Sequence, residues 1–142
     1  MKTYYTFSDV FLIPQMSTCK SRSELSTNTK IGSFELDVPI ISSNMDTITG
    51  PDMAAAMFSA GGIGAMHRFN SIEDSVRDYK SVREAGADCF VSVGVSEDSI
   101  DRARALRAAG ASHFIIDIAH GHSAMMRHTL KVMRNTFGFG ED

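Results

Sequence analysis

Short apolar runs alternate along the chain with longer segments in which apolar side chains recur every three or four residues. The apolar runs predict strands over 38–43, 63–66, 90–95 and 114–118. Strands that are apolar throughout are typical of a parallel sheet with both faces covered. The longer segments have the spacing of helices that bury one face, so the pattern predicts alternating strands and helices.

Two of these helices are marked by their first residues. Ser71 followed by Asp74 is a capping-box pattern, and Ser123 is the expected N-cap of the last helix, which we expect to end at Gly138. Apolar residues then fall on one face of each helix, at Ile72, Val76, Tyr79 and Val82 and at Met126, Leu130, Met133 and Phe137. The segment 52–59 is apolar nearly all round, which predicts the most buried helix.

A repeat links the helices to the strands. Residues 85–91 and 109–115 are copies offset by 24 positions, and 60–63 is a looser copy. Each copy places a glycine, which can end a helix in the left-handed conformation, before a short apolar run. The repeat is a βα unit, and it fits either a doubly wound sheet or part of an eight-stranded barrel of about 250 residues.

The first 37 residues lack this period. They contain Pro14, a Ser/Thr-rich stretch over 17–29 and Gly32, so we expect an irregular arm over 1–37 ahead of the βα units of 38–142.

Composition narrows the class of protein. The chain has 142 residues, a formal net charge of -3 and 43% apolar residues, which suit one domain and exclude a charge-driven binder of nucleic acid or anionic lipid. It has no apolar run of about 20 residues and no secretory signal pattern near its start. Cys19 and Cys89 form no CxxC pair. We therefore expect a cytoplasmic protein with a small-molecule partner and no membrane or nucleic-acid partner.

Polar residues follow the predicted strands, where ligands bind in both architectures. Asp117 ends an apolar strand, and a carboxylate there needs a ligand, a cap or an ion pair to compensate its burial. The candidate ion-pair partner is Arg68, which follows a neighbouring strand. Arg68 could also offer its guanidinium to a phosphate or carboxylate. Asp46 and Thr47 could orient a ligand, but such a pair near the start of a helix is more often a cap, and we interpret it as one.

Other chemistry finds less support. His120 and His122 have the spacing of two metal ligands, but no carboxylate or cysteine stands at ligand spacing beside them, so no metal is expected. Nothing places a base beside Cys19, and Cys89 enters a predicted buried strand. No serine lies in a G-x-S-x-G motif.

Five separated motifs resemble the IMP dehydrogenase/GMP reductase family in order and spacing. They are SSNMDT at 42–47, GGIG at 61–64, MHRF at 66–69, SVGV at 92–95 and DIAHGHS at 117–123. The arm agrees through FSDV at 7–10, IP at 13–14 and SRSE at 21–24. The resemblance covers nearly all of residues 5–137.

The resemblance implies a TIM-type βα barrel, usually a tetramer, of which this chain would supply an N-terminal arm and about the first four βα units. Many IMP dehydrogenases insert a regulatory domain after the second barrel helix, whereas here that helix runs through Gly86 into Phe90. This favours GMP reductase, which converts GMP to IMP and ammonia with NADPH. The alternatives are IMP dehydrogenase, which forms XMP with NAD, and a non-catalytic nucleotide-binding or assembly partner.

The resemblance also implies roles for individual residues, which are assigned by their positions in the matching motifs. Ser43, Asn44 and Met45 correspond to the nucleotide-binding rim, with Met45 against the purine. Asp117, with Ile118 and Ala119 after it, corresponds to the cofactor side of the site. Arg68 stands where many relatives have a lysine implicated in proton handling. Arg68 and Asp117 are the candidate catalytic residues.

The family's nucleophilic cysteine follows the sixth barrel strand, and its main phosphate-binding glycines come later, beyond Asp142. The resemblance therefore predicts that these 142 residues are inactive alone and act with a complementary C-terminal half or as an oligomer. A half barrel would also leave its first and fourth strands as unpaired edges.

Overall fold

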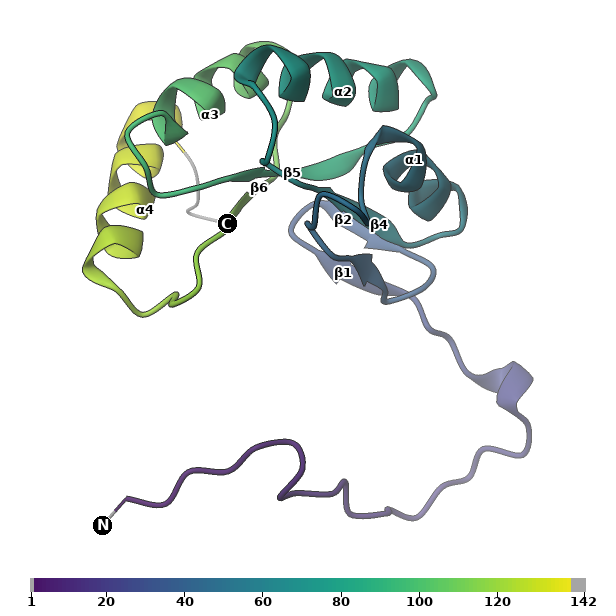
Figure 1. Ribbon diagram of the computed structural model, residues 1–142. Coiled ribbons are helices and arrows are strands. Elements are labelled where there is room, and N and C mark those ends of the chain that lie inside the picture. The colour runs from purple at the N-terminus through teal and green to yellow at the C-terminus, as the bar shows by residue number, and fades with distance from the viewer. Residues whose placement is uncertain (1, 139–142) are drawn as a thin grey trace.

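The computed structural model describes residues 2–138 (Figure 1). In chain order the elements are η1 (Arg22–Glu24), β1 (Thr29–Ile31), β2 (Phe34–Leu36), β3 (Ile41–Ser42), α1 (Pro51–Ser59), β4 (Ile63–Met66), α2 (Ile72–Glu84), β5 (Cys89–Val93), α3 (Ser99–Ala108), β6 (Phe114–Ile116) and α4 (Ala124–Phe137).

Four strands form a curved parallel sheet in the order β3-β4-β5-β6. Each strand pairs with the next one along the chain, and the four α-helices lie in an arc on the outer side of the sheet (Figure 1). A doubly wound sheet reverses its strand order and has helices on both faces. The unreversed order and the one-sided helices therefore identify four consecutive βα units of a barrel, as the resemblance predicted.

The main core fills the space between this sheet and its helices. Residues of β4 and β5 pack there against α1, α2 and α3, and the buried members include Ala54, Met66, Tyr79, Val82, Cys89, Val91 and Leu106. Helix α1 lies so close to β4 that a Cβ on Gly64 would come within 2.6 Å of the Cα of Ala54. Glycine at that position is thus required by packing.

A hairpin packs against the amino-terminal ends of the sheet strands, on the side away from the helices. Strands β1 and β2 pair antiparallel around Gly32, whose φ is +58°. Phe34 of the hairpin packs edge-on against Phe90, with ring centroids 5.3 Å apart, and lies 3.9 Å from the ring of His113. Ser33 Oγ is 2.7 Å from His113 Nε2. The expectation of an irregular arm to residue 37 is therefore wrong for 29–36, because these contacts come from strands more than 50 residues away.

The predicted N-caps Ser71 and Ser123 and the predicted helix end at Gly138 are confirmed by the structure. Ser71 Oγ accepts the Asp74 N–H at 3.0 Å, Ser123 Oγ accepts the Met126 N–H at 3.2 Å, and α4 ends at Gly138 with φ at +67°. Strand β4 has the predicted bounds, β5 begins one residue before its predicted range and ends two residues inside it, and β3 and β6 end or begin up to three residues inside theirs.

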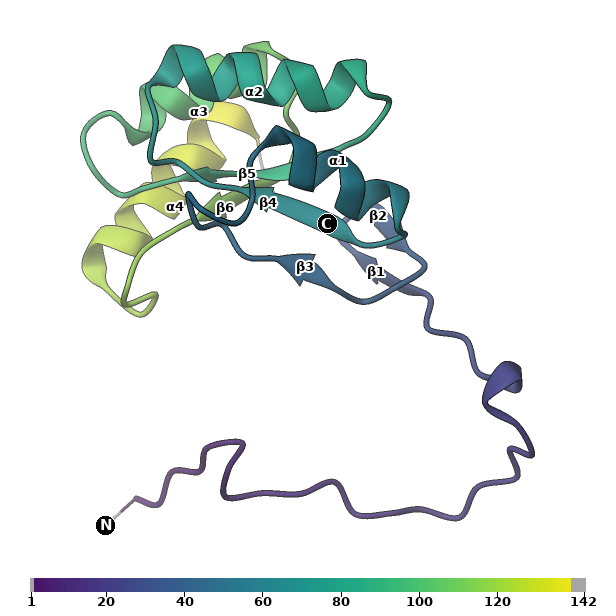
Figure 2. The ribbon, with the colours of Figure 1, turned by 45° about the vertical axis from the view of Figure 1, so that its right-hand side comes forward.

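Two predictions about α1 are wrong. Ala54 is its one buried residue, and Met53 and Phe58 are exposed, because α1 stands at the end of the helix row beside the edge strand β3 (Figure 2). Asp46 and Thr47 do not cap α1, because the N-cap is Gly50 without a side-chain hydrogen bond. Those two residues lie instead in a turn after β3.

Residues 2–28 extend away from the sheet and helices (Figure 2). Large apolar side chains of this arm are exposed, among them Tyr4, Tyr5, Phe7, Phe11, Leu12, Ile13 and Met16. None of the helices within 2–138 combines the length and apolar character needed to cross a bilayer.

Candidate functional site

The loops that follow the four parallel strands gather at one edge of the sheet. They are residues 43–50 after β3, 67–71 after β4, 94–98 after β5 and 117–123 after β6. All of the candidate site residues predicted from the sequence lie in these loops. Because the strands are parallel, the four loops are neighbours at one edge of the sheet. The sequence thus predicted the edge of the sheet that carries the polar residues.

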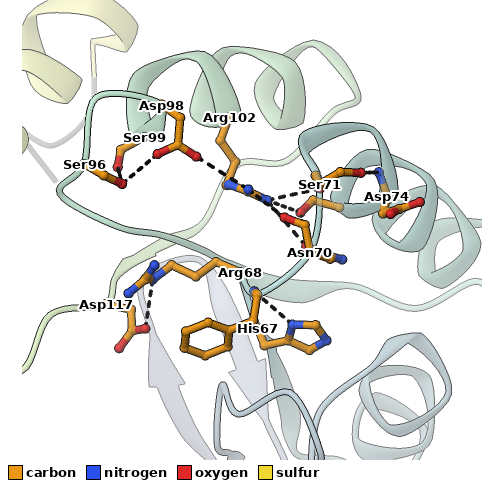
Figure 3. A network of polar contacts seen from close by, with 12 residues as sticks. His67, Arg68, Asn70, Ser71, Asp74, Ser96, Asp98, Ser99, Arg102 and Asp117 are labelled. Carbon is orange, nitrogen blue, oxygen red and sulfur yellow. Dashed lines mark hydrogen bonds and ion pairs between the residues drawn. The ribbon is translucent and has the colours of Figure 1, made fainter.

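Arg68 and Asp117 form an ion pair across this edge (Figure 3). Arg68 Nε donates to Asp117 Oδ2 at 3.0 Å, and the side chains are 29% and 30% exposed. Arg68 follows β4 and Asp117 follows β6, so the pair reaches over the end of β5, a span of two strand spacings or roughly 9–10 Å. The partner proposed from the sequence is confirmed, and both groups remain accessible to a small molecule.

Gly94 makes this crossing possible. It follows β5, directly beneath the guanidinium, and a Cβ at this position would lie 3.2 Å from Arg68 Nη1 and 3.3 Å from Cζ. A Cβ there would require the guanidinium to shift by a few tenths of an ångström, and a larger side chain would require more. Sequence reasoning missed this residue, because a glycine after a strand gives no sign of which side chain passes over it.

The loop after β3 is fixed by a buried threonine. Thr49 Oγ1 lies 2.6 Å from the Ser43 carbonyl oxygen and 2.8 Å from Ser42 Oγ. Asn44 turns toward the inner side of the sheet, where its Nδ2 donates to Ser92 Oγ at 3.2 Å. Met45 is 53% exposed. The loop therefore presents an apolar thioether side chain from an anchored backbone.

An aromatic side chain also belongs to this edge and was not singled out from the sequence. Phe69 is 58% exposed, yet the Arg68 guanidinium lies 5.0 Å from its ring centroid and the His67 ring is stacked near it at 6.3 Å. The Phe69 N–H donates to His67 Nδ1 at 3.2 Å. These contacts hold an apolar ring at the solvent edge, where it can face a planar ligand.

The loop after β6 carries the remaining predicted residues. Ile118 is half-buried, whereas Ala119, His120 and His122 are exposed. Within 2–138, no three His, Cys, Asp or Glu side chains come together as a set of metal ligands.

Neither thiol of the chain lies at this edge. Cys89 is buried in the core between the sheet and the helices, and burial raises its pKa to about 12. Cys19 is exposed in the arm. Since the thiolate is the nucleophilic form, Cys89 is an inert core residue, as the sequence indicated.

Four βα units with an ion pair and exposed apolar groups at the carboxyl ends of the strands define part of a βα barrel with a candidate ligand site. The family model described as the IMP dehydrogenase / GMP reductase domain matches residues 4–139, and the chain belongs to this family.

Individual relatives agree with this assignment. The chain is 31% identical over 137 residues to a GMP reductase of Streptococcus pneumoniae (strain P1031) and 33% identical over 138 residues to one of Streptococcus agalactiae serotype Ia. Each match covers 94% of this chain and 42% of the relative. The crystal structure of inosine 5' monophosphate dehydrogenase from Legionella pneumophila superposes with a TM-score of 0.83 at 42% identity, covering 94% of this chain and 41% of that one. The chain thus spans about two fifths of the length of these relatives.

Proposed function

We propose that this chain supplies the first half of the nucleotide site in a purine nucleotide oxidoreductase. The first reaction that we propose is that of GMP reductase, the reductive deamination of GMP to IMP and ammonia with NADPH. The observation that supports it most is the Arg68–Asp117 pair, which lies at the same sheet edge as the 43–45 loop. A purine base and a nicotinamide that bind at this edge would both lie within reach of the charged side chains of this pair.

The residues present fit the purine. Ser43 and Asn44 have polar side chains beside an anchored backbone, and Met45 offers a polarizable apolar surface on which a purine face can pack. Phe69 adds a second apolar surface at the edge.

The loop after β6 fits a nicotinamide. Within the described residues Asp117 contacts Arg68 through Oδ2, which leaves Oδ1 to accept a carboxamide N–H, and the small Ala119 is exposed beside it. NADPH, or NAD in the dehydrogenase, supplies the hydride chemistry when bound. Asp117, Ile118 and Ala119 would hold its nicotinamide end.

Arg68 would stabilise negative charge during the reaction. A guanidinium stays protonated at all relevant pH values, so Arg68 does not exchange a proton with the departing ammonia. Its Nε–H is held by Asp117, which leaves the Nη groups to face a ligand. Arg68 is thus an electrostatic group, in contrast to the lysine expected of many relatives.

The remaining parts of the site would come from the other half of the barrel. Within 2–138, β3 and β6 each pair along one edge only. We propose that further βα units, in a complementary C-terminal half, pair with these edges and bring the nucleophilic cysteine and phosphate-binding glycines. A homo-oligomer such as a tetramer is the proposed assembly.

IMP dehydrogenase is the second candidate, favoured by the 42% identity to the Legionella enzyme. Absorbance at 340 nm separates the two reactions when the assembled barrel is supplied with either GMP and NADPH or IMP and NAD. We expect NADPH consumption with release of ammonia in the first mixture, and loss of at least tenfold in rate for Asp117→Asn. NADH formation in the second mixture alone would favour the dehydrogenase, and no turnover in either would contradict an oxidoreductase.

A further inference from the structure

A buried arginine on α3 lies next to the candidate site but takes no part in it. The side chain of Arg102 is 8% exposed, and its guanidinium reaches from α3 across to the loop between β4 and α2 (Figure 3). Burying a charged group is costly unless hydrogen bonds and an opposite charge compensate it. The hydrogen-bond and ion-pair partners of this guanidinium therefore indicate which part of the structure it stabilises.

Almost all of these partners belong to the β4–α2 loop and the first turn of α2. The Nη2 group donates to the Asn70 carbonyl oxygen at 2.8 Å. The Nη1 group donates to the Ser71 carbonyl oxygen at 3.2 Å and to Ser75 Oγ at 2.5 Å, and it lies 3.4 Å from Asn70 Oδ1. One planar group thus fixes two consecutive backbone carbonyls, which a lysine ammonium cannot do in the same geometry.

The same guanidinium is tied to the next loop along the sheet edge. Asp98, at the start of α3, lies 3.6 Å from Arg102 Nη2, and its carboxylate accepts the Ser96 hydroxyl at 2.6 Å. The Ser96 hydroxyl, followed by Arg102, lowers the pKa of Asp98 below its ordinary value. Arg102 therefore joins the loop after β4 to the loop after β5, through hydrogen bonds on one side and an ion pair on the other (Figure 3).

This network bears directly on Arg68. Asn70 is two residues from Arg68, and the loop between β4 and α2 contains only residues 67–71. A loop of this length that is fixed at its far end has little freedom at its near end. The Arg68 guanidinium must stay over Gly94 to reach Asp117 at 3.0 Å, so the position of the loop determines whether the ion pair forms.

We propose that Arg102 is a positioning residue that holds the 67–71 loop so that Arg68 meets Asp117 at the sheet edge. It touches neither member of the pair and acts through the backbone of Asn70 and Ser71. The importance of the pair for catalysis rests on the proposed function, whereas its positioning by Arg102 does not.

The test observes the Arg68 Nε–H directly by NMR of the ¹⁵N-labelled chain. Arg68→Lys removes this resonance and so assigns it, and Asp117→Asn gives its value without the ion pair. We expect Arg102→Met to shift the resonance toward the Asp117→Asn value and to speed its hydrogen exchange at least tenfold. Arg102→Lys, which can serve one carbonyl but not both, should give an intermediate exchange rate.

Two controls on the same helix separate positioning from loss of stability. Arg104→Met removes an exposed arginine that pairs with Asp101, and Leu106→Ala destabilises the core between the sheet and the helices. Neither should change the Arg68 resonance. If Leu106→Ala releases Arg68 as much as Arg102→Met does, Arg102 acts through stability alone and the proposal is wrong.

The remaining outcomes are also decisive. An unchanged Arg68 resonance in folded Arg102→Met overturns the proposal, and if that variant does not fold, an unchanged resonance in Arg102→Lys does so. Titration of the assembled wild-type barrel with GMP and IMP tests the proposed function separately. Release of Arg68 without any nucleotide binding by the wild type would retain the positioning role and reject the proposed function.

Discussion

Replacing Gly94 by valine should disable the candidate site while leaving the fold intact. A Cβ at this position already lies 3.2 Å from Arg68 Nη1 and 3.3 Å from Arg68 Cζ, both closer than an ordinary contact, and the two methyl groups of valine extend further. The guanidinium must then move, and the 3.0 Å bond to Asp117 breaks once its length exceeds about 3.5 Å.

The effect on stability should be small. The two side chains of the pair are about 30% exposed, and solvent-exposed ion pairs contribute about 0.2–1 kcal/mol. The effect on ligand binding should be larger, because a hydrogen bond to a charged group contributes about 1.5–3 kcal/mol. We therefore expect GMP or IMP affinity to fall by about tenfold or more, while the free energy of unfolding falls by about 1 kcal/mol or less.

Calorimetric titration with GMP and IMP, together with urea unfolding, measures both quantities. Gly121→Val is the matched control, because Gly121 lies in the loop after β6 and a Cβ there meets nothing within 4 Å. Unchanged affinity in Gly94→Val would refute the reasoning, as would an equal loss in Gly121→Val.

Three further predictions concern the fold and the thiols. Phe34→Ala should lower the free energy of unfolding, measured with urea, by about 3–5 kcal/mol, because it removes a buried ring that packs on Phe90 and His113. A change below about 1 kcal/mol would show that the hairpin is not part of the core. Burial lowers the pKa of His113 from 6.5, so the unfolded chain binds the proton more readily, and the free energy of unfolding should fall as the pH drops below about 6.5. This pH dependence should weaken in His113→Gln, and an identical pH profile in that variant would contradict the prediction. A thiol reagent should modify Cys19 at once and Cys89 only on unfolding, and rapid modification of two thiols in the folded chain would contradict the burial of Cys89.

Features set by neighbouring residues could be predicted from the sequence. The caps at Ser71 and Ser123 and the helix end at Gly138 depend on side chains within a few positions, and the structure has them as predicted. The polar edge of the sheet followed from the βα repeat, because parallel strands bring their carboxyl ends together. The Arg68–Asp117 contact followed from the same argument.

Features set by distant residues could not be predicted in this way. The hairpin depends on Phe34 meeting Phe90 and His113, and the apolar character of 52–59 does not reveal that α1 stands at the end of a helix row. The sequence gives no sign that Arg102 is buried, because the carbonyl groups that it contacts lie about 30 residues earlier in the chain. Tertiary contacts of this kind give no local signal.

The central claim is that the carboxyl edge of this sheet binds a purine nucleotide. Titration of the barrel assembled from the ¹⁵N-labelled chain and its complementary half with GMP and with IMP, followed through the backbone amide shifts of this chain, tests it most directly. The account predicts saturable shifts at Asn44, Met45 and Phe69 and in the loop after β6, with little change in the β1–β2 hairpin at the opposite end of the strands. Shifts confined to the hairpin or to the outer helix faces, or no saturable shift at the carboxyl edge, would contradict it.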